Sequence, residues 1–119
     1  MATTAQPEAT TETTAGPTIA KAWGVDAPDE QLKPMEIERR ALRPDDVAIK
    51  ITWAGICHSD LHQCRNDWHN SRYPVVPGHE IVGLVTAVGP KVTKYKVGDT
   101  VAVGTVVDAD LTCAECQAG

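Results

Sequence analysis

The sequence predicts a small, mostly β, barrel-like domain with one short helix. Its 119 residues are enough for about one domain. Residues 47–54 alternate large apolar side chains with small or polar ones, which is the period of a β-strand, and residues 80–88 form a nearly continuous apolar run rich in Val and Ile. Clusters of Pro, Gly and Asp separate these runs, as in the turns of a β-rich domain.

Two strands are expected before the alternating segment. Residues 19–25 are short and half apolar, consistent with an opening strand. Residues 32–40 carry a proline near their start, which fits an edge strand. Arg43-Pro44-Asp45-Asp46 predicts a turn before the strand at 47–54.

The short helix is expected from Cys57 to about Arg65. Ser59 is placed to cap it and Asp60 lies in its first turn. Residues 66–78 are crowded with Asn, Asp, Ser and Pro and predict a loop.

The end of the chain combines one more strand with a pair of cysteines. A tight turn at Val97-Gly98-Asp99 precedes a strand predicted over 100–107. Cys113-Ala114-Glu115-Cys116 follows, and the chain stops at Gly119. A strand-rich chain that stops in a small-residue loop is expected to be truncated.

Composition argues against several classes of protein. The net charge of −5 argues against a nucleic-acid partner, and no run of 18 apolar residues predicts a membrane span. Residues 1–18 lack Lys and Arg, match neither a signal nor a transit peptide, and are expected to be a disordered tail. A cytoplasmic protein is therefore expected, in which cysteines beside histidines indicate a metal more often than disulfides.

The residues able to carry chemistry are concentrated between positions 57 and 79, which hold all four histidines and two of the four cysteines. Cys57 follows a predicted strand and His79 precedes the next one. A thiolate and an imidazole held by two rigid elements suit Zn²⁺. On these two residues alone, a buried structural cysteine and a solvated loop histidine are an equal alternative.

A longer pattern favours the metal site. Residues 55–62 (Gly-Ile-Cys-His-Ser-Asp-Leu-His) and Gly78-His79-Glu80 with Gly83, Gly89 and Val92 resemble the two ligand segments of zinc-dependent medium-chain alcohol dehydrogenases. The resemblance covers about Ile19 to Gly119 and is greatest to the cinnamyl-alcohol-dehydrogenase-like, broad-specificity aldehyde reductase branch. It implies a GroES-like, partly open β-barrel.

The resemblance also implies a role for each matching residue. Cys57 and His79 would be two of three ligands of a catalytic zinc, with Glu80 as the adjacent acid that can approach the metal. Ser59 would receive the proton of the zinc-bound alcohol, and His62, three residues further along the helix, would pass it toward solvent.

The resemblance also bears on other histidine, tryptophan and cysteine side chains. His58 matches a position that approaches the cofactor pyrophosphate, and Trp68 is expected to line the substrate pocket. For Trp53, a core position on its alternating strand is favoured over a place in the pocket. Cys64 and His69 match no ligand position.

A second, structural zinc in this family is held by four thiolates spaced Cys-x-x-Cys-x-x-Cys-x7-Cys. Cys113 and Cys116 match the second and third positions, but Asp110 stands at the first. Two thiolates and one carboxylate do not close a tetrahedral site, so this zinc is expected to be absent or weak. The alternative is a site that Asp110 and residues outside this chain complete.

The resemblance implies NADP(H) as cofactor, a small alcohol or aldehyde as substrate, and a homodimer as the common assembly. The sequence contains no Gly-x-Gly-x-x-Gly nucleotide turn and no third catalytic ligand. We therefore expect the N-terminal part of an alcohol dehydrogenase, inactive as an isolated chain. A non-enzymatic β module that binds zinc or packs against a partner is the alternative.

Overall fold

Five strands and two short helices follow one another along residues 16–119, the part of the chain that the computed structural model describes. In chain order they are β1 (Thr18–Gly24), β2 (Lys33–Arg39), β3 (Val47–Ala54), α1 (His58–Arg65), β4 (Ile81–Val88), β5 (Thr100–Val103) and α2 (Ala114–Ala118). The disordered tail expected over residues 1–18 lies outside the described residues as far as residue 15, and Thr18 begins β1. The mostly β class is confirmed.

Two local predictions are corrected. The strand expected over 100–107 ends at Val103, because Val103 pairs with Ile81, the first residue of β4, and the residues beyond it have no partner in that strand. A second helix, α2, follows Cys113 where no helix was expected. It has only five residues, too few for a periodic pattern to reveal it.

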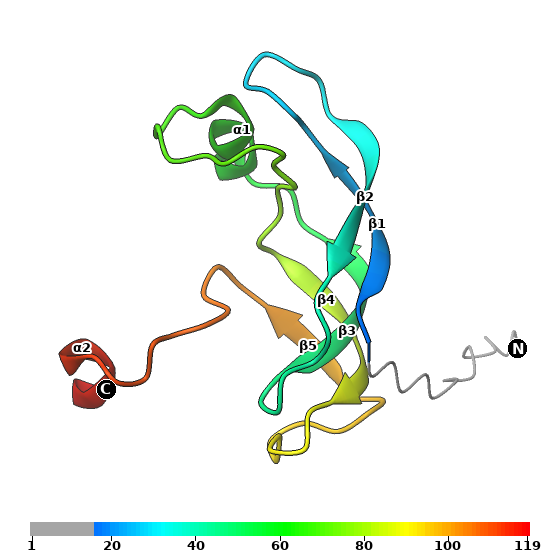
Figure 1. Cartoon of the computed structure of the whole chain (residues 1–119), viewed down its shortest axis with the longest axis vertical. Coiled ribbons are helices and arrows are strands. Elements are labelled where there is room, and N and C mark those ends of the chain that lie inside the picture. The colour runs from blue at the N-terminus through cyan, green and yellow to red at the C-terminus, as the bar shows by residue number, and fades with distance from the viewer. Residues whose placement is uncertain (1–15) are drawn as a thin grey trace, which may run out of the picture.

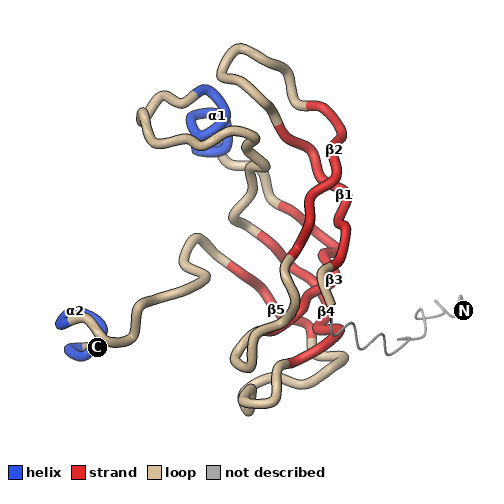
Figure 2. The backbone as a smooth tube through the Cα atoms, viewed as in Figure 1, coloured by secondary structure: helices blue, strands red, loops and turns tan. Residues whose placement is uncertain are grey.

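The strands form two antiparallel sheets that do not close into a barrel within the described residues. The first sheet is the β1–β2 hairpin, paired from Thr18 opposite Arg39 to Gly24 opposite Lys33. The second has the order β3–β4–β5, with β4 in the centre. Figure 1 shows the hairpin passing beside this sheet, with α1 near the hairpin tip, and Figure 2 shows the long loops that connect the elements. The arrangement agrees with a partly open barrel.

The buried core is small and divided. Val25, Val75 and Cys64 pack together, with Tyr73 against them, between the hairpin, the loop after α1 and α1 itself. Val25 and Val75 also exchange backbone hydrogen bonds of 2.9 and 2.8 Å. This bridge ties the hairpin to the loop that leads into β4, and so holds the residues just before His79.

The prediction that Trp53 belongs to the core is wrong, because its side chain is 75% exposed. β3 is an edge strand, and its register against β4 shifts between Ile51 and Trp53. Alternation along a strand shows only which residues share a face; whether that face is covered depends on other elements. Neither α1 nor α2 has the length and apolar character of a membrane-spanning helix, and the described residues contain no other candidate.

Candidate metal centre

Cys57 and Glu80 are brought together where β3 and β4 separate. Gly55, just after β3, donates a backbone hydrogen bond to the Glu80 carbonyl oxygen at 2.8 Å. A side chain at position 55 would collide with the Glu80 carboxylate. Gly55 therefore permits a close approach that places Glu80 beside the turn leading to Cys57.

His79 enters the same space from the loop before β4. Gly78 has a φ of +133°, a backbone conformation that side chains disfavour, so the Pro-Gly sequence directs the chain sharply into His79. The preceding loop is fixed to α1, because the Ser71 hydroxyl donates to the Gln63 carbonyl at 2.5 Å and the Tyr73 hydroxyl to the Cys64 carbonyl at 2.6 Å.

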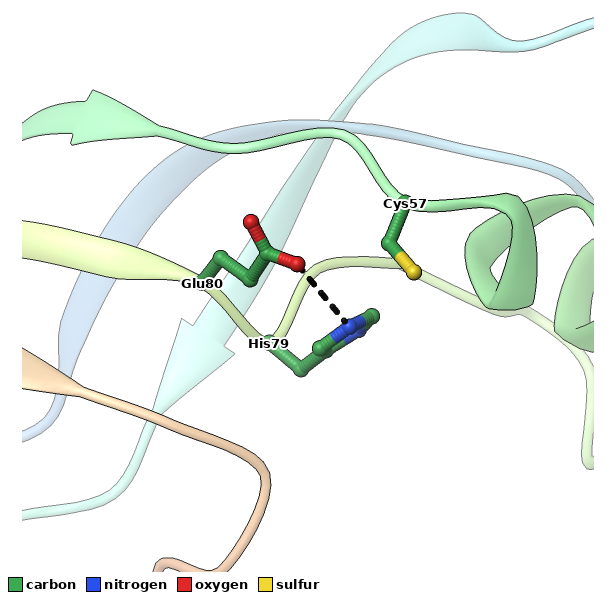
Figure 3. Close-up of side chains that lie close together, drawn as sticks. All are labelled: Cys57, His79 and Glu80. Carbon is green, nitrogen blue, oxygen red and sulfur yellow. Dashed lines mark ion pairs between the residues drawn. The ribbon is translucent and has the colours of Figure 1, made fainter.

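Cys57, His79 and Glu80 form one cluster, with a ligand atom of each lying within 4.8 Å of the others. Figure 3 shows the three side chains facing a common point, Cys57 from the start of α1 and the other two from the start of β4. Cys57 and His79 are half-buried, whereas the Glu80 side chain is 54% exposed. A thiolate, an imidazole and a carboxylate form a donor set that fits Zn²⁺.

Asp60 supports both ligand segments, a role that the sequence analysis missed. Its Oδ2 accepts a hydrogen bond from the Cys57 backbone N–H at 2.9 Å, and its Oδ1 lies 3.1 Å from His79 Nδ1. The carboxylate thus orients the imidazole so that Nε2 lies on the side of Glu80. Its sequence neighbourhood signalled only a helix start, because the contact with His79 spans 19 positions.

The capping prediction is corrected by the same contact. Cys57, not Ser59, is the N-cap residue of α1, and Asp60 pairs with its backbone. Ser59 is already inside the helix, and its hydroxyl lies 3.4 Å from His79 Nε2. The Ser59 hydroxyl therefore lies beside the imidazole of the cluster.

The charges of the cluster are coupled. The Ser59 side chain and backbone, followed by His79, lower the pKa of the Cys57 thiol. Cys57 in turn raises the pKa of the His79 imidazole, and Asp60 adds to the effect. Each member of the ligand pair therefore shifts the pKa of the other toward its charged form.

His62 and Trp68 lie together on the exposed side of α1. His62 Nδ1 is 2.7 Å from Asp67 Oδ2, and the His62 ring contacts the rings of His58 and Trp68 at centroid distances of 4.7 and 5.3 Å. The expected pocket residue Trp68 is 51% exposed. The His62 side chain is thus partly exposed, with Asp67, His58 and Trp68 as its neighbours.

Asp110, Cys113 and Cys116 form a second cluster after β5, again with ligand atoms within 4.8 Å. Hydrogen bonds from Thr112, side chain first, lower the pKa of Asp110. This cluster lies in one short exposed segment. The two residues that match no ligand position lie outside both clusters: Cys64 is the buried residue of α1, and His69 is an exposed loop residue.

Comparison with known families identifies a match over more than half of the chain. The model of the alcohol dehydrogenase GroES-like domain matches residues 43–119. A rice protein named "Probable cinnamyl alcohol dehydrogenase 8B" is 53% identical over 100 residues, which are 84% of this chain and 23% of that protein. The Escherichia coli aldehyde reductase YahK is 52% identical over 99 residues, 83% of this chain and 28% of that protein.

Solved structures show the same fold. The cinnamyl alcohol dehydrogenase SbCAD4 from Sorghum bicolor superposes with a TM-score of 0.82 at 48% identity, over 86% of this chain and 29% of that chain. A Helicobacter pylori CAD, solved in complex with NADP(H), also gives 0.82, at 41% identity over 86% and 29%. The chain thus spans about a quarter of the length of the relatives it matches.

Proposed function

Because the chain belongs to the alcohol dehydrogenase GroES-like domain family, we propose that it forms the zinc-binding part of an alcohol dehydrogenase or aldehyde reductase. The complete catalyst interconverts primary alcohols and aldehydes with NADP(H). The observation that carries this proposal is the convergence of Cys57, His79 and Glu80 within 4.8 Å, backed by Asp60. Relatives named as cinnamyl alcohol dehydrogenase and aldehyde reductase support the substrate class.

In the proposed site, Cys57 and His79 hold zinc and Glu80 lies next to it. Zinc, when bound, polarises a carbonyl oxygen and stabilises an alkoxide. Asp60 keeps His79 Nδ1 occupied, so that the ring presents Nε2. Glu80 Oε1 lies 3.7 Å from His79 Nε2, so the carboxylate would be able to take the place of a water ligand of the zinc.

Ser59 and His62 would carry the proton. The Ser59 hydroxyl lies 3.4 Å from His79 Nε2, on the side of the ring that faces the cluster. His62 is one helical turn further on, and its Nδ1 lies 2.7 Å from Asp67 Oδ2. The order Ser59, His62, solvent therefore leads outward from the metal centre.

The substrate and nucleotide contacts are proposed for the exposed side of α1. Trp68 offers an apolar ring next to His62 for the substrate, and His58 offers an imidazole for the cofactor phosphates. The printed residues include no glycine-rich nucleotide turn. We therefore expect no turnover from these 119 residues alone. The expected location is the cytoplasm.

Metal analysis of the purified chain tests the metal centre. We expect bound zinc, and on replacement with Co²⁺ the absorption bands of a tetrahedral thiolate site. Cys57→Ser should abolish the bands, whereas Cys64→Ser, at a buried cysteine outside the cluster, should retain them. Bands that are equal in both variants would contradict the assignment.

A chimera tests the activity separately. The chain replaces the matching segment of the E. coli aldehyde reductase, and NADPH oxidation is followed with an aromatic aldehyde. We expect reductase activity that His79→Ala abolishes and that His69→Ala leaves unchanged. A folded chimera that binds zinc without reducing aldehydes would favour the alternative, a non-enzymatic zinc-binding module.

A further inference from the structure

The segment after β5 carries a pair of thiols that the proposed function does not use. Cys113 and Cys116 lie at the start and within α2, which stands apart from both sheets in Figure 1. Their sulfur atoms are 3.3 Å apart and both side chains are half-buried. A disulfide bond of about 2.05 Å requires only a small approach of the two sulfurs.

Asp110 holds this geometry through hydrogen bonds. Its Oδ1 accepts from the backbone N–H groups of Thr112 and Cys113, each at 2.6 Å, and also from the Thr112 hydroxyl. Gln117 Nε2 donates to the Leu111 carbonyl at 2.6 Å and closes the same turn. The two sulfurs are therefore brought together by donors and acceptors of the segment itself.

In this donor set a carboxylate stands where the family resemblance implies the first of four thiolates. A closed structural zinc site has four ligands, mostly thiolates, whereas the cluster in residues 16–119 has two thiolates and one carboxylate. Asp110 Oδ1 already accepts three hydrogen bonds, so a cation that bound this atom would compete with the donors of the turn. The carboxylate organises the turn and is a poor replacement for a third thiolate.

We propose that Cys113 and Cys116 form a redox-active dithiol, which closes to an intramolecular disulfide by exchange with a low-molecular-weight disulfide of the glutathione class. One cysteine thiolate attacks the small disulfide, forming a mixed disulfide and releasing one small thiolate. The second cysteine thiolate then attacks the protein sulfur of that mixed disulfide and releases the other small thiolate. The protein pair loses two electrons, the small disulfide gains them, and the two thiol protons pass to the released thiolates or to solvent.

Thiol trapping in glutathione buffers tests the proposal. The purified chain, freed of metal with a chelator, is equilibrated with increasing oxidised glutathione, alkylated, and mapped by mass spectrometry. We expect the peptide containing both cysteines to lose two hydrogens and to escape alkylation. Cys113→Ser should instead leave Cys116 carrying glutathione, and Cys64→Ser should behave like the parent. A pair that stays alkylated at every glutathione ratio would overturn the proposal.

Zinc competition separates the dithiol from a structural metal site. In a His79→Ala background, which disables the first cluster, we expect equimolar zinc to slow disulfide closure by less than about twofold, because metal binding by this donor set is weak. Asp110→Cys restores a third thiolate and should increase this protection to about tenfold or more. Full protection by zinc with Asp110 in place would show a metal site and overturn the proposal.

Discussion

The two clusters of metal-ligating side chains are assembled in different ways. Cys57 and His79 lie more than 20 positions apart and meet only because α1, β4 and the intervening loop pack together. Asp110, Cys113 and Cys116 fall within seven consecutive residues, and a hydrogen-bonded turn brings them together. The first cluster therefore depends on tertiary structure, whereas the second needs only its own segment.

The support of each cluster differs as well. In the first, the carboxylate of Asp60 lies behind the ligands and orients them, leaving the ligand atoms free. In the second, the carboxylate of Asp110 occupies a ligand position itself and is engaged by backbone donors. The Asp60 carboxylate therefore orients the ligands without being one, whereas the Asp110 carboxylate stands at a ligand position and is bound by its own turn.

Loss of Cys57 should have the largest effect on metal binding. Cys57→Ala removes a direct ligand of the first cluster, so we expect zinc affinity to fall by more than about 100-fold, beyond the effect of losing a supporting hydrogen bond. Competition with a chromogenic chelator measures the affinity. Cys113→Ala is the matched control and should leave the tight site intact; equal losses in the two variants would remove the distinction between the clusters.

Loss of the supporting carboxylate should come next. Asp60→Asn keeps the shape of the side chain but removes the charge that faces His79 Nδ1, so we expect zinc affinity to fall about 10–100-fold. Asp67→Asn is the control, because Asp67 has a similar contact with His62 outside the cluster. An unchanged affinity in Asp60→Asn would show that Asp60 only caps α1.

Removal of the Asp110 carboxylate should act locally. Asp110→Ala leaves the backbone N–H groups of Thr112 and Cys113 without their acceptor, which should lower the free energy of local opening and speed amide exchange there several-fold. Amide hydrogen exchange at these two residues measures the loss. The urea midpoint of the whole chain should not move; a shifted midpoint would mean that the segment is part of the cooperative core.

Acidification should reveal the smallest effect, at the turn between β2 and β3. Arg40, followed by the backbone N–H of Arg43, lowers the pKa of Asp46 to about 2. The folded state therefore binds fewer protons than the unfolded one, and the stabilisation present above about pH 4 is lost as the pH falls toward 2. Asp46→Asn should reduce this acid sensitivity.

The expected change in unfolding free energy near neutral pH is below about 1 kcal/mol, because Arg40 and Arg43 are largely exposed. Urea unfolding at several pH values measures it, with Asp45→Asn as the control at the exposed neighbouring position. The Asp46 carboxylate, like that of Asp110, bonds only to nearby residues in the described part of the chain, so zinc binding should not change. A loss of zinc in Asp46→Asn would contradict the division between local and long-range carboxylates.

Residue patterns predicted most elements correctly. The alternation at 47–54 and the apolar run at 80–88 gave two paired strands, and the pairing of β3 with β4 places Cys57 and His79 at the same end of the sheet. Asp60 was not predicted as a support for His79, since no local pattern encodes a contact between side chains so far apart. Trp53 was misplaced because the covering of a sheet face is not a property of its own strand.

The sequence by itself determined where strands and turns form and which residue types can bind a metal, because periodicity, glycine and proline act over a few neighbouring residues. Only the tertiary structure decided that Cys57, His79 and Glu80 share one point and that Asp60 orients them. It also revealed that Asp110 is engaged by its own turn. The shared point and its support depend on distances between separate segments, which arise only when the chain packs, whereas the Asp110 turn depends on the backbone conformation of its own segment.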